Sequence, residues 1–198
     1  MATYDFYTWC LMTALVSFLG FTVENIWIAF RFKFIDNRNM HLPFLLGYGL
    51  AIALIYLTLG TPTSLSPAFR FLYYAMLFFI VSFGEIVLGT SVEKLCGFYY
   101  WDYSSLPLHF TRYTSVFTSL GFSLIIFTFM DKFFTGIMTL LSSVCAGNVL
   151  VKDVACILAA LMVFDFLVSF HKMYKVRGLN RRWAFKLEDG RISREIYR

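Results

Sequence analysis

The sequence predicts an all-α fold, specifically a polytopic bundle of membrane-spanning helices, and three observations support this. First, 59% of its 198 residues are hydrophobic and only 15% are charged, whereas soluble proteins have roughly 45–50% and about 25%. Second, several apolar segments approach the roughly 20 residues that a helix needs to cross a bilayer. Third, these segments are continuously apolar, whereas the strands of a membrane β-barrel alternate between apolar and polar residues.

Six apolar segments are the predicted spans, so about six transmembrane helices are expected. The first is too long for a cleavable signal peptide and lacks its basic start. The second is short, and the fifth contains Ser142, Ser143 and Asn148, so five or four spans are the alternatives. In chain order the segments are residues 6–30, 44–59, 71–90, 114–130, 133–151 and 154–170.

Basic residues gather after the last span, which predicts a transmembrane domain over residues 1–171 and a basic tail over residues 172–198. The tail holds nine lysines or arginines and three acids, so it is expected in the cytoplasm. The first loop, with Arg31, Lys33 and Arg38, also favours the cytoplasm. Six spans put that loop on the other side, whereas five spans with an external N-terminus satisfy both segments. The orientation of the first four spans therefore stays open.

Three acids fall within spans, where ionisable side chains are costly and usually face protein or water. They are Glu24, Glu85 and Asp165. Spans one and three run in the same direction, so Glu24 and Glu85 lie toward the same membrane face. That face also receives the loop "GFYYWDYSSLPLHF" over residues 97–110. For Asp165, which could pair with Lys132 or Lys152, a structural role is at least as good an explanation.

The aromatic loop is predicted to cap a polar ligand pocket with Glu24 and Glu85 at its floor. Amphipathic tryptophan and tyrosine rings suit the level of the membrane interface. The alternative is an ordinary interfacial belt of aromatic residues above carboxylates that only join helices. The predicted ligand-binding residues are Glu24, Glu85, Trp101, Asp102, Tyr103, His109 and Arg112.

The same loop is expected to be ordered. Pro107 restricts the backbone and disfavours helix at the residue before it. Asp102 can accept backbone hydrogen bonds and cap a turn, so its removal is expected to destabilise the fold. Asp5, in the N-terminal segment, is expected to be solvated and to matter less.

A short internal repeat is a further feature. "LGFTVENI" at residues 19–26 resembles "LGTSVEKL" at residues 88–95, and the offset between them spans two helices. A two-helix repeat keeps its direction across the membrane, as in transporters built from parallel repeats. The repeat pairs Glu24 with Glu93, whereas depth in the membrane pairs Glu24 with Glu85.

Two stretches carry a family resemblance: "SFLGFTVENIW" at residues 17–27 and "GEIVLGTSVEKLCGFYYWDYSSLPLHFTRY" at residues 84–113. In the first, a glycine lies one helical turn before Glu24. In the second, Glu85 is followed by Trp-Asp-Tyr-Ser at residues 101–104. This pattern resembles the Putative ABC-transporter type IV family, also called CmpB-type, and is similar to transmembrane protein 229. Tyr48 and Gly49 match a further Tyr-Gly of the bacterial members. The resemblance covers residues 6–130 and implies a transport permease.

The sequence leaves three functions open. The first is binding or transport of a small or amphipathic ligand, and the second is an intramembrane enzyme that uses Glu85 or Asp102 as base on a lipid. The third is an accessory subunit. Nucleophile-elbow, zinc-protease, P-loop and dinucleotide-binding motifs are absent. No cofactor and no metal site are predicted, although His41 and His109 with the carboxylates would form the alternative. Expected partners are membrane lipids and a second copy or another membrane subunit, but not nucleic acid.

Overall fold

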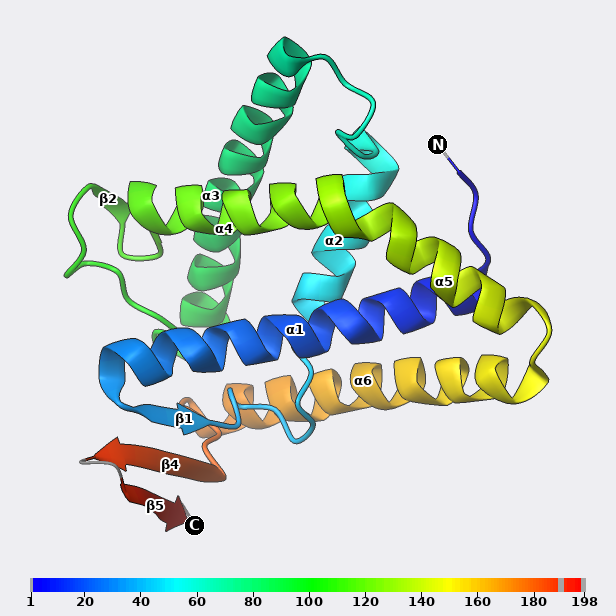
Figure 1. Cartoon of the computed structure of the whole chain (residues 1–198). Helices are drawn as coiled ribbons and strands as arrows, with labels where there is room; N and C mark the ends of the chain where they lie inside the picture. The colour runs from blue at the N-terminus through cyan, green and yellow to red at the C-terminus, as the bar shows by residue number, and fades with distance from the viewer. Residues whose placement is uncertain (1, 189–190, 197–198) are drawn as a thin grey trace. The chain divides into compact units, whose positions relative to one another are not determined.

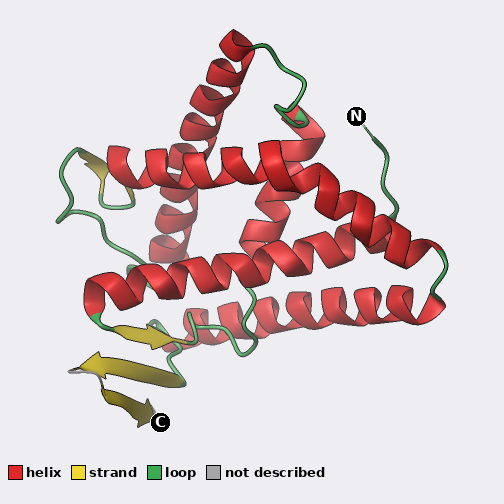
Figure 2. Cartoon of the chain, in the orientation of Figure 1, coloured by secondary structure: helices red, strands yellow, loops and turns green. Residues whose placement is uncertain are grey.

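A computed structural model describes residues 2–188 and 191–196 of the chain, and it is mainly helical (Figure 2). Short strands accompany the helices, so the described chain is not purely α. In order, the elements are α1 (Phe6–Phe32), β1 (Phe34–Asp36), α2 (Leu46–Leu59), α3 (Pro67–Cys96), β2 (His109–Thr111), β3 (Thr114–Ser115), α4 (Val116–Thr128), the π-helical η1 (Phe129–Phe133), α5 (Phe134–Ala146), α6 (Val149–Val176), β4 (Trp183–Glu188) and β5 (Arg191–Ile196).

Four helices in the described part of the chain are long and apolar enough to cross a membrane. They are α1, α3, α6 and the continuous helix Val116–Ala146, while α2 is a shorter apolar helix. The predicted membrane protein with several helical spans is therefore confirmed. The count of six differs, because the fourth and fifth predicted spans join into one helix. The prediction separated these two spans at Asp131 and Lys132, because charged residues suggested a loop. Both residues lie inside η1.

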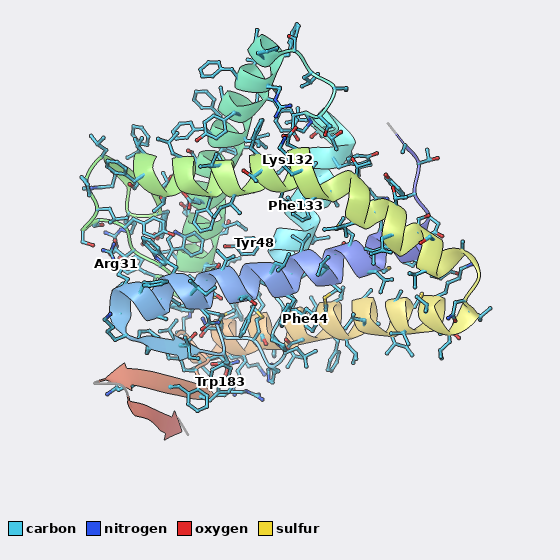
Figure 3. The ribbon with its side chains drawn as sticks, in the orientation of Figure 1. Arg31, Phe44, Tyr48, Lys132, Phe133 and Trp183 are labelled. Carbon is cyan, nitrogen blue, oxygen red and sulfur yellow. The ribbon has the colours of Figure 1, made fainter. Side chains whose placement is uncertain are left out.

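The chain divides into two compact units, which are described separately. Unit 1 comprises Met1–Leu54 and Leu140–Arg198, and unit 2 comprises Ile55–Thr139. In unit 1, α1 and α6 lie side by side and run in the same direction (Figure 1). Ala14, Leu46 and Met162 form a buried cluster against which Phe44, labelled in Figure 3, packs.

The ends of α1 and α6 are joined by a three-stranded antiparallel sheet in the order β1-β4-β5. Buried asparagines reinforce this junction: Asn180 Nδ2 donates to the carbonyl of Asn39, and Asn37 Nδ2 donates to the carbonyl of Asn180, both at 3.1 Å. The ends of α1 and α6 therefore lie on the same side of any membrane that both helices cross. The helix α6 runs on to Val176, and β4, beyond it, pairs with β1. The boundary between residues 1–171 and 172–198 stays a prediction.

Local sequence explains where the long helices begin and end. Asp5 is the N-cap of α1 and accepts a hydrogen bond from the Thr8 amide at 2.7 Å, so it is not merely solvated as expected. The helix ends at Lys33 in the left-handed region. The proline that begins α3 suits its first turn, because backbone amides there have no carbonyl acceptor within the helix. Gly97 supplies the left-handed residue that ends α3.

In unit 2, α3 packs against α4, and the connecting loop carries the β2–β3 hairpin. The predicted order of this loop is confirmed by its own backbone bonds. The Tyr103 amide donates to the Arg112 carbonyl at 2.7 Å, and the Val116 amide donates to the Leu108 carbonyl at 3.0 Å.

Candidate functional site

Unit 1 contains a contact between a glycine, a tyrosine and a glutamate. Gly20 on α1 faces the ring of Tyr48, so closely that a Cβ at Gly20 would lie 2.5 Å from Tyr48 Cγ. The Tyr48 hydroxyl then donates to Glu24 Oε1 at 2.8 Å, one helical turn further along α1. We call Gly20, Tyr48 and Glu24 the first Gly-Tyr-Glu contact. It fastens the start of α2 to α1.

Glu24 is also neutralised. Arg38 binds Glu24 Oε2 through Nη2 at 2.6 Å and through Nε at 2.7 Å. Arg38 lies in the left-handed region, and its amide donates to Asp36 Oδ1 at 2.9 Å. Asp36 Oδ2 in turn lies 3.2 Å from Nε of Arg181, in the segment between α6 and β4. Both oxygens of Glu24 are therefore occupied by groups of the protein itself.

Unit 2 repeats this contact. Gly89 on α3 faces the ring of Tyr113, where a Cβ would overlap the ring. The Tyr113 hydroxyl donates to Glu93 Oε2, again one turn further along the helix. Burial first, and then the bond to Glu93, raise the pKa of Tyr113, so the phenol stays protonated and donates. We call Gly89, Tyr113 and Glu93 the second Gly-Tyr-Glu contact.

The two contacts agree with the internal repeat. Gly20 aligns with Gly89 and Glu24 with Glu93 when "LGFTVENI" is placed on "LGTSVEKL". The structural counterpart of Glu24 is therefore Glu93, which was not among the predicted ligand-binding residues. The repeat was the signal that could have added Glu93 to that set. The tyrosine partners had no such signal, because their loops differ in length.

Trp101 of the Trp-Asp-Tyr-Ser motif supports the second contact. Its Nε1 donates to the Tyr113 carbonyl at 2.9 Å, and its ring meets the Tyr113 ring edge to face at 6.2 Å. The motif therefore holds Tyr113 on α3. This accounts for the aromatic character of the loop by contacts within unit 2.

Glu85 lies one turn before Gly89 on the same face of α3 and has different surroundings. Ser119 Oγ donates to Glu85 Oε2 at 3.2 Å, and the Thr114 hydroxyl also interacts with this carboxylate. Ser119 and Thr114 are fully buried, and their hydroxyl oxygens lie 2.8 Å apart. Among the described residues no lysine, arginine or histidine forms an ion pair with Glu85. It is a carboxylate of a membrane helix held by hydroxyls.

The other predicted site residues of the loop make local contacts. Asp102 Oδ1 accepts from the Ser104 amide at 2.8 Å, which confirms the predicted turn cap. Hydrogen bonding with the side chain of Ser104, and then with its amide, lowers the pKa of Asp102, and nearby Arg112 and His109 lower it further. Arg112 stacks over the Tyr99 ring at 4.1 Å, and His109 Nδ1 lies 2.9 Å from the Leu106 carbonyl. Glu24 is in unit 1 and all the others are in unit 2.

Asp165, the third acid within a span, has a structural role. Its carboxylate accepts from the amides of His41 and Leu42 at 3.0 and 2.9 Å, and His41 Nδ1 lies 2.8 Å from Oδ1. It thereby caps the loop before α2. The suggested partners Lys132 and Lys152 lie elsewhere: Lys132 pairs with Asp131 and Lys152 stacks over Tyr7.

Comparison with known proteins gives a family and no individual relative. A family model described as Putative ABC-transporter type IV matches residues 11–170. This match reaches into α6, beyond residue 130, where the resemblance of the two motifs ended. No curated protein and no solved structure matches the chain. Similarity to transmembrane protein 229 stays a prediction.

Proposed function

Because the chain belongs to the Putative ABC-transporter type IV family, we propose that it is a transporter-like membrane protein that binds a small or amphipathic ligand at Glu85. The observation that carries this proposal is the contrast in charge balance between Glu85 and Glu24. Glu24 is paired with Arg38 at 2.6 Å, whereas the partners of Glu85 are hydroxyls. A carboxylate kept without a cation in a membrane helix costs free energy, which is typical of a functional position.

The surroundings of Glu85 favour a ligand with a positively charged group. A cation would supply the charge that the protein does not supply, while the hydroxyls of Ser119 and Thr114 can accept or donate further hydrogen bonds. Apolar side chains of α3 and α4 suit the hydrophobic part of an amphipathic molecule. The remaining predicted ligand-binding residues, Trp101, Asp102, Tyr103, His109 and Arg112, would act by holding the loop above this position.

The charge distribution and the sheet together support an orientation for the chain. The ends of α1 and α6 share one side, because β1 pairs with β4. An odd number of crossings must then lie between α1 and α6. If α3 and Val116–Ala146 both cross the membrane, α2 has to cross as well, which makes three. α2 is therefore the fifth span. The basic tail and the first loop both come to lie in the cytoplasm, with the N-terminus outside. This is the five-span alternative of the sequence.

Labelling of a single cysteine tests this orientation. In a variant whose native cysteines are replaced, Ser64→Cys places an exposed thiol between α2 and α3. A membrane-impermeant maleimide added outside intact cells should label it, but should leave an Arg177→Cys variant in the tail unlabelled. Labelling of Ser64→Cys only after permeabilisation, with Arg177→Cys also unlabelled from outside, would show that α2 does not cross.

Binding of a hydrophobic cation tests the ligand proposal. Purified full-length protein in nanodiscs is titrated with radiolabelled tetraphenylphosphonium as the probe. We expect saturable binding that is lost in Glu85→Gln, which keeps the shape of the side chain and one acceptor oxygen but removes its charge.

The matched control is Asp153→Asn, which removes an exposed acid near the start of α6. It should leave binding unchanged. Equal binding by wild type and Glu85→Gln, or equal loss in both variants, would contradict the proposal.

A further inference from the structure

The π-helical segment η1 lies within the helix Val116–Ala146 and contains part of an ion cluster. Asp131 Oδ2 lies 2.6 Å from Arg70 Nη2 and 3.0 Å from Lys132 Nζ. Thr63 Oγ1 also donates to the Asp131 carbonyl at 3.0 Å, where the widened turn of a π-helix leaves carbonyls available. Such single-turn π segments occur frequently at functional sites.

The cluster carries an unbalanced positive charge. Two cations share one oxygen of Asp131, while its Oδ1 is buried and has no hydrogen-bond partner in the described chain. The Asp131 side chain is 2% exposed, whereas that of Lys132 is 64% exposed. The ammonium group of Lys132 is therefore open to a second, anionic partner.

Lys132 cannot lie in the hydrocarbon of the bilayer with that exposure, because a charged side chain there is costly. From Val116 to Asp131 the helix covers about 22 Å, or about three quarters of the roughly 30 Å thickness of the hydrocarbon core. Lys132 thus marks the level of the lipid headgroups.

A shallow, open apolar groove runs from this level along η1 and α4. It has a volume of about 420 Å³ and is lined by Leu124, Ile125, Thr128, Phe129 and Phe133. Lys132 follows Thr128 by one turn and directly precedes Phe133, and Figure 3 labels both Lys132 and Phe133 where α4 passes into α5. A lipid with its phosphate at Lys132 would have a chain beside this groove.

We propose that Lys132 and the α4 groove form a binding site for an anionic phospholipid, with the headgroup phosphate on Lys132 and one acyl chain in the groove. Charge complementarity selects an anionic lipid, since the cluster has one positive charge in excess. An ammonium group at the headgroup level attracts the opposite charge of an anionic headgroup. The site is separate from Glu85 and does not depend on its proposed ligand.

Native mass spectrometry of the full-length protein in detergent tests this site. The probes are phosphatidylglycerol and phosphatidylcholine with identical acyl chains, and glycerol phosphate as the headgroup alone. We expect wild type to retain phosphatidylglycerol in preference to phosphatidylcholine, and Lys132→Gln to reduce that preference about fivefold. Thr128→Trp, which fills the groove from an exposed position, should reduce retention of phosphatidylglycerol as well.

Two control variants and the third probe make the test decisive. Lys152→Gln removes a lysine that stacks over Tyr7, and Thr139→Trp adds the same bulk to an exposed threonine of α5; neither should change retention. The proposal is overturned if wild type retains both lipids equally, or if Lys152→Gln or Thr139→Trp lowers retention as much as the paired site variant. Glycerol phosphate competing as well as the whole lipid would overturn the role of the groove. Should Lys132→Gln fail to fold, the comparison of the two threonine variants still decides.

Discussion

The two Gly-Tyr-Glu contacts share their geometry and differ in their charges. In each, a glycine admits a tyrosine ring to a long helix and the hydroxyl binds a glutamate one turn later. In unit 1 the glutamate is also paired with Arg38. In unit 2 the same helix face carries a second acid, Glu85, at the position that corresponds to Val16 in unit 1 when Glu93 is aligned with Glu24. The Gly-Tyr-Glu contact, which both units share, holds a tyrosine against a long helix. Glu85, which only unit 2 has, is the residue for which a function is proposed.

The largest expected effect comes from closing the space at one of the glycines. Gly89→Leu would displace the Tyr113 ring and lower the free energy of unfolding by about 2–3 kcal/mol, as overpacking does. Gly84→Leu is the matched control, because nothing lies within 4 Å of a Cβ at Gly84 on the same helix. Chemical unfolding in detergent, followed by circular dichroism, measures both. Equal loss in the two variants would mean that the fit of Tyr113 to α3 is unimportant.

Removal of Arg38 should have the next largest effect. Arg38→Gln leaves Glu24, a mostly buried carboxylate, without its cation, and should lower the free energy of unfolding by about 2 kcal/mol. In Glu24→Gln/Arg38→Gln the loss should be smaller than the sum of the single losses. Arg112→Gln, which removes an arginine stacked on Tyr99, should cost less than about 1 kcal/mol. Additive losses at Glu24 and Arg38 would contradict the pairing.

Exchange of Glu85 for the residue of unit 1 separates function from stability. Glu85→Val should leave the free energy of unfolding within about 1 kcal/mol of wild type, because an apolar side chain often replaces a buried polar group at little cost. Thr114 and Ser119 can still bond to each other at 2.8 Å. The same unfolding measurement checks this. Loss of folding in Glu85→Val would make Glu85 structural, like Glu24.

The smallest effect concerns two capping aspartates. Asp102→Ala and Asp5→Ala should each lower the free energy of unfolding by about 0.5–1 kcal/mol, since each removes one bond to a backbone amide. Hydrogen bonds from Ser104 and from Thr8 lower the pKa of Asp102 and of Asp5 respectively. Their contribution is therefore present above the unfolded pKa of about 3.9 and is lost as the pH falls through the lower folded pKa. At a pH well below the folded and the unfolded pKa, each variant should have the same free energy of unfolding as wild type. A remaining difference there would contradict the role of the ionised aspartates.

The sequence predicted the local features of this fold better than its long-range pairings. Apolar length identified the spans, and the match around Glu24 and Glu93 identified the repeat. The pairing of β1 with β4 joins a segment near the start of the chain to one near its end, and Asp165 binds the distant His41 amide. Nothing in local composition specifies such partners. Asp131 misled the span count because its neutralisation by Arg70 depends on another helix.

Parallel measurements on Glu85→Gln and Glu93→Gln distinguish a carboxylate that binds a ligand from one that holds the fold. Both variants remove one carboxylate charge from the same face of α3, two helical turns apart. Unfolding and tetraphenylphosphonium binding are measured on each full-length protein in the same lipid. We expect that Glu85→Gln loses binding while its unfolding matches wild type, and that Glu93→Gln unfolds more readily. Binding lost in Glu93→Gln but kept in Glu85→Gln, or unfolding weakened equally in both, would contradict it.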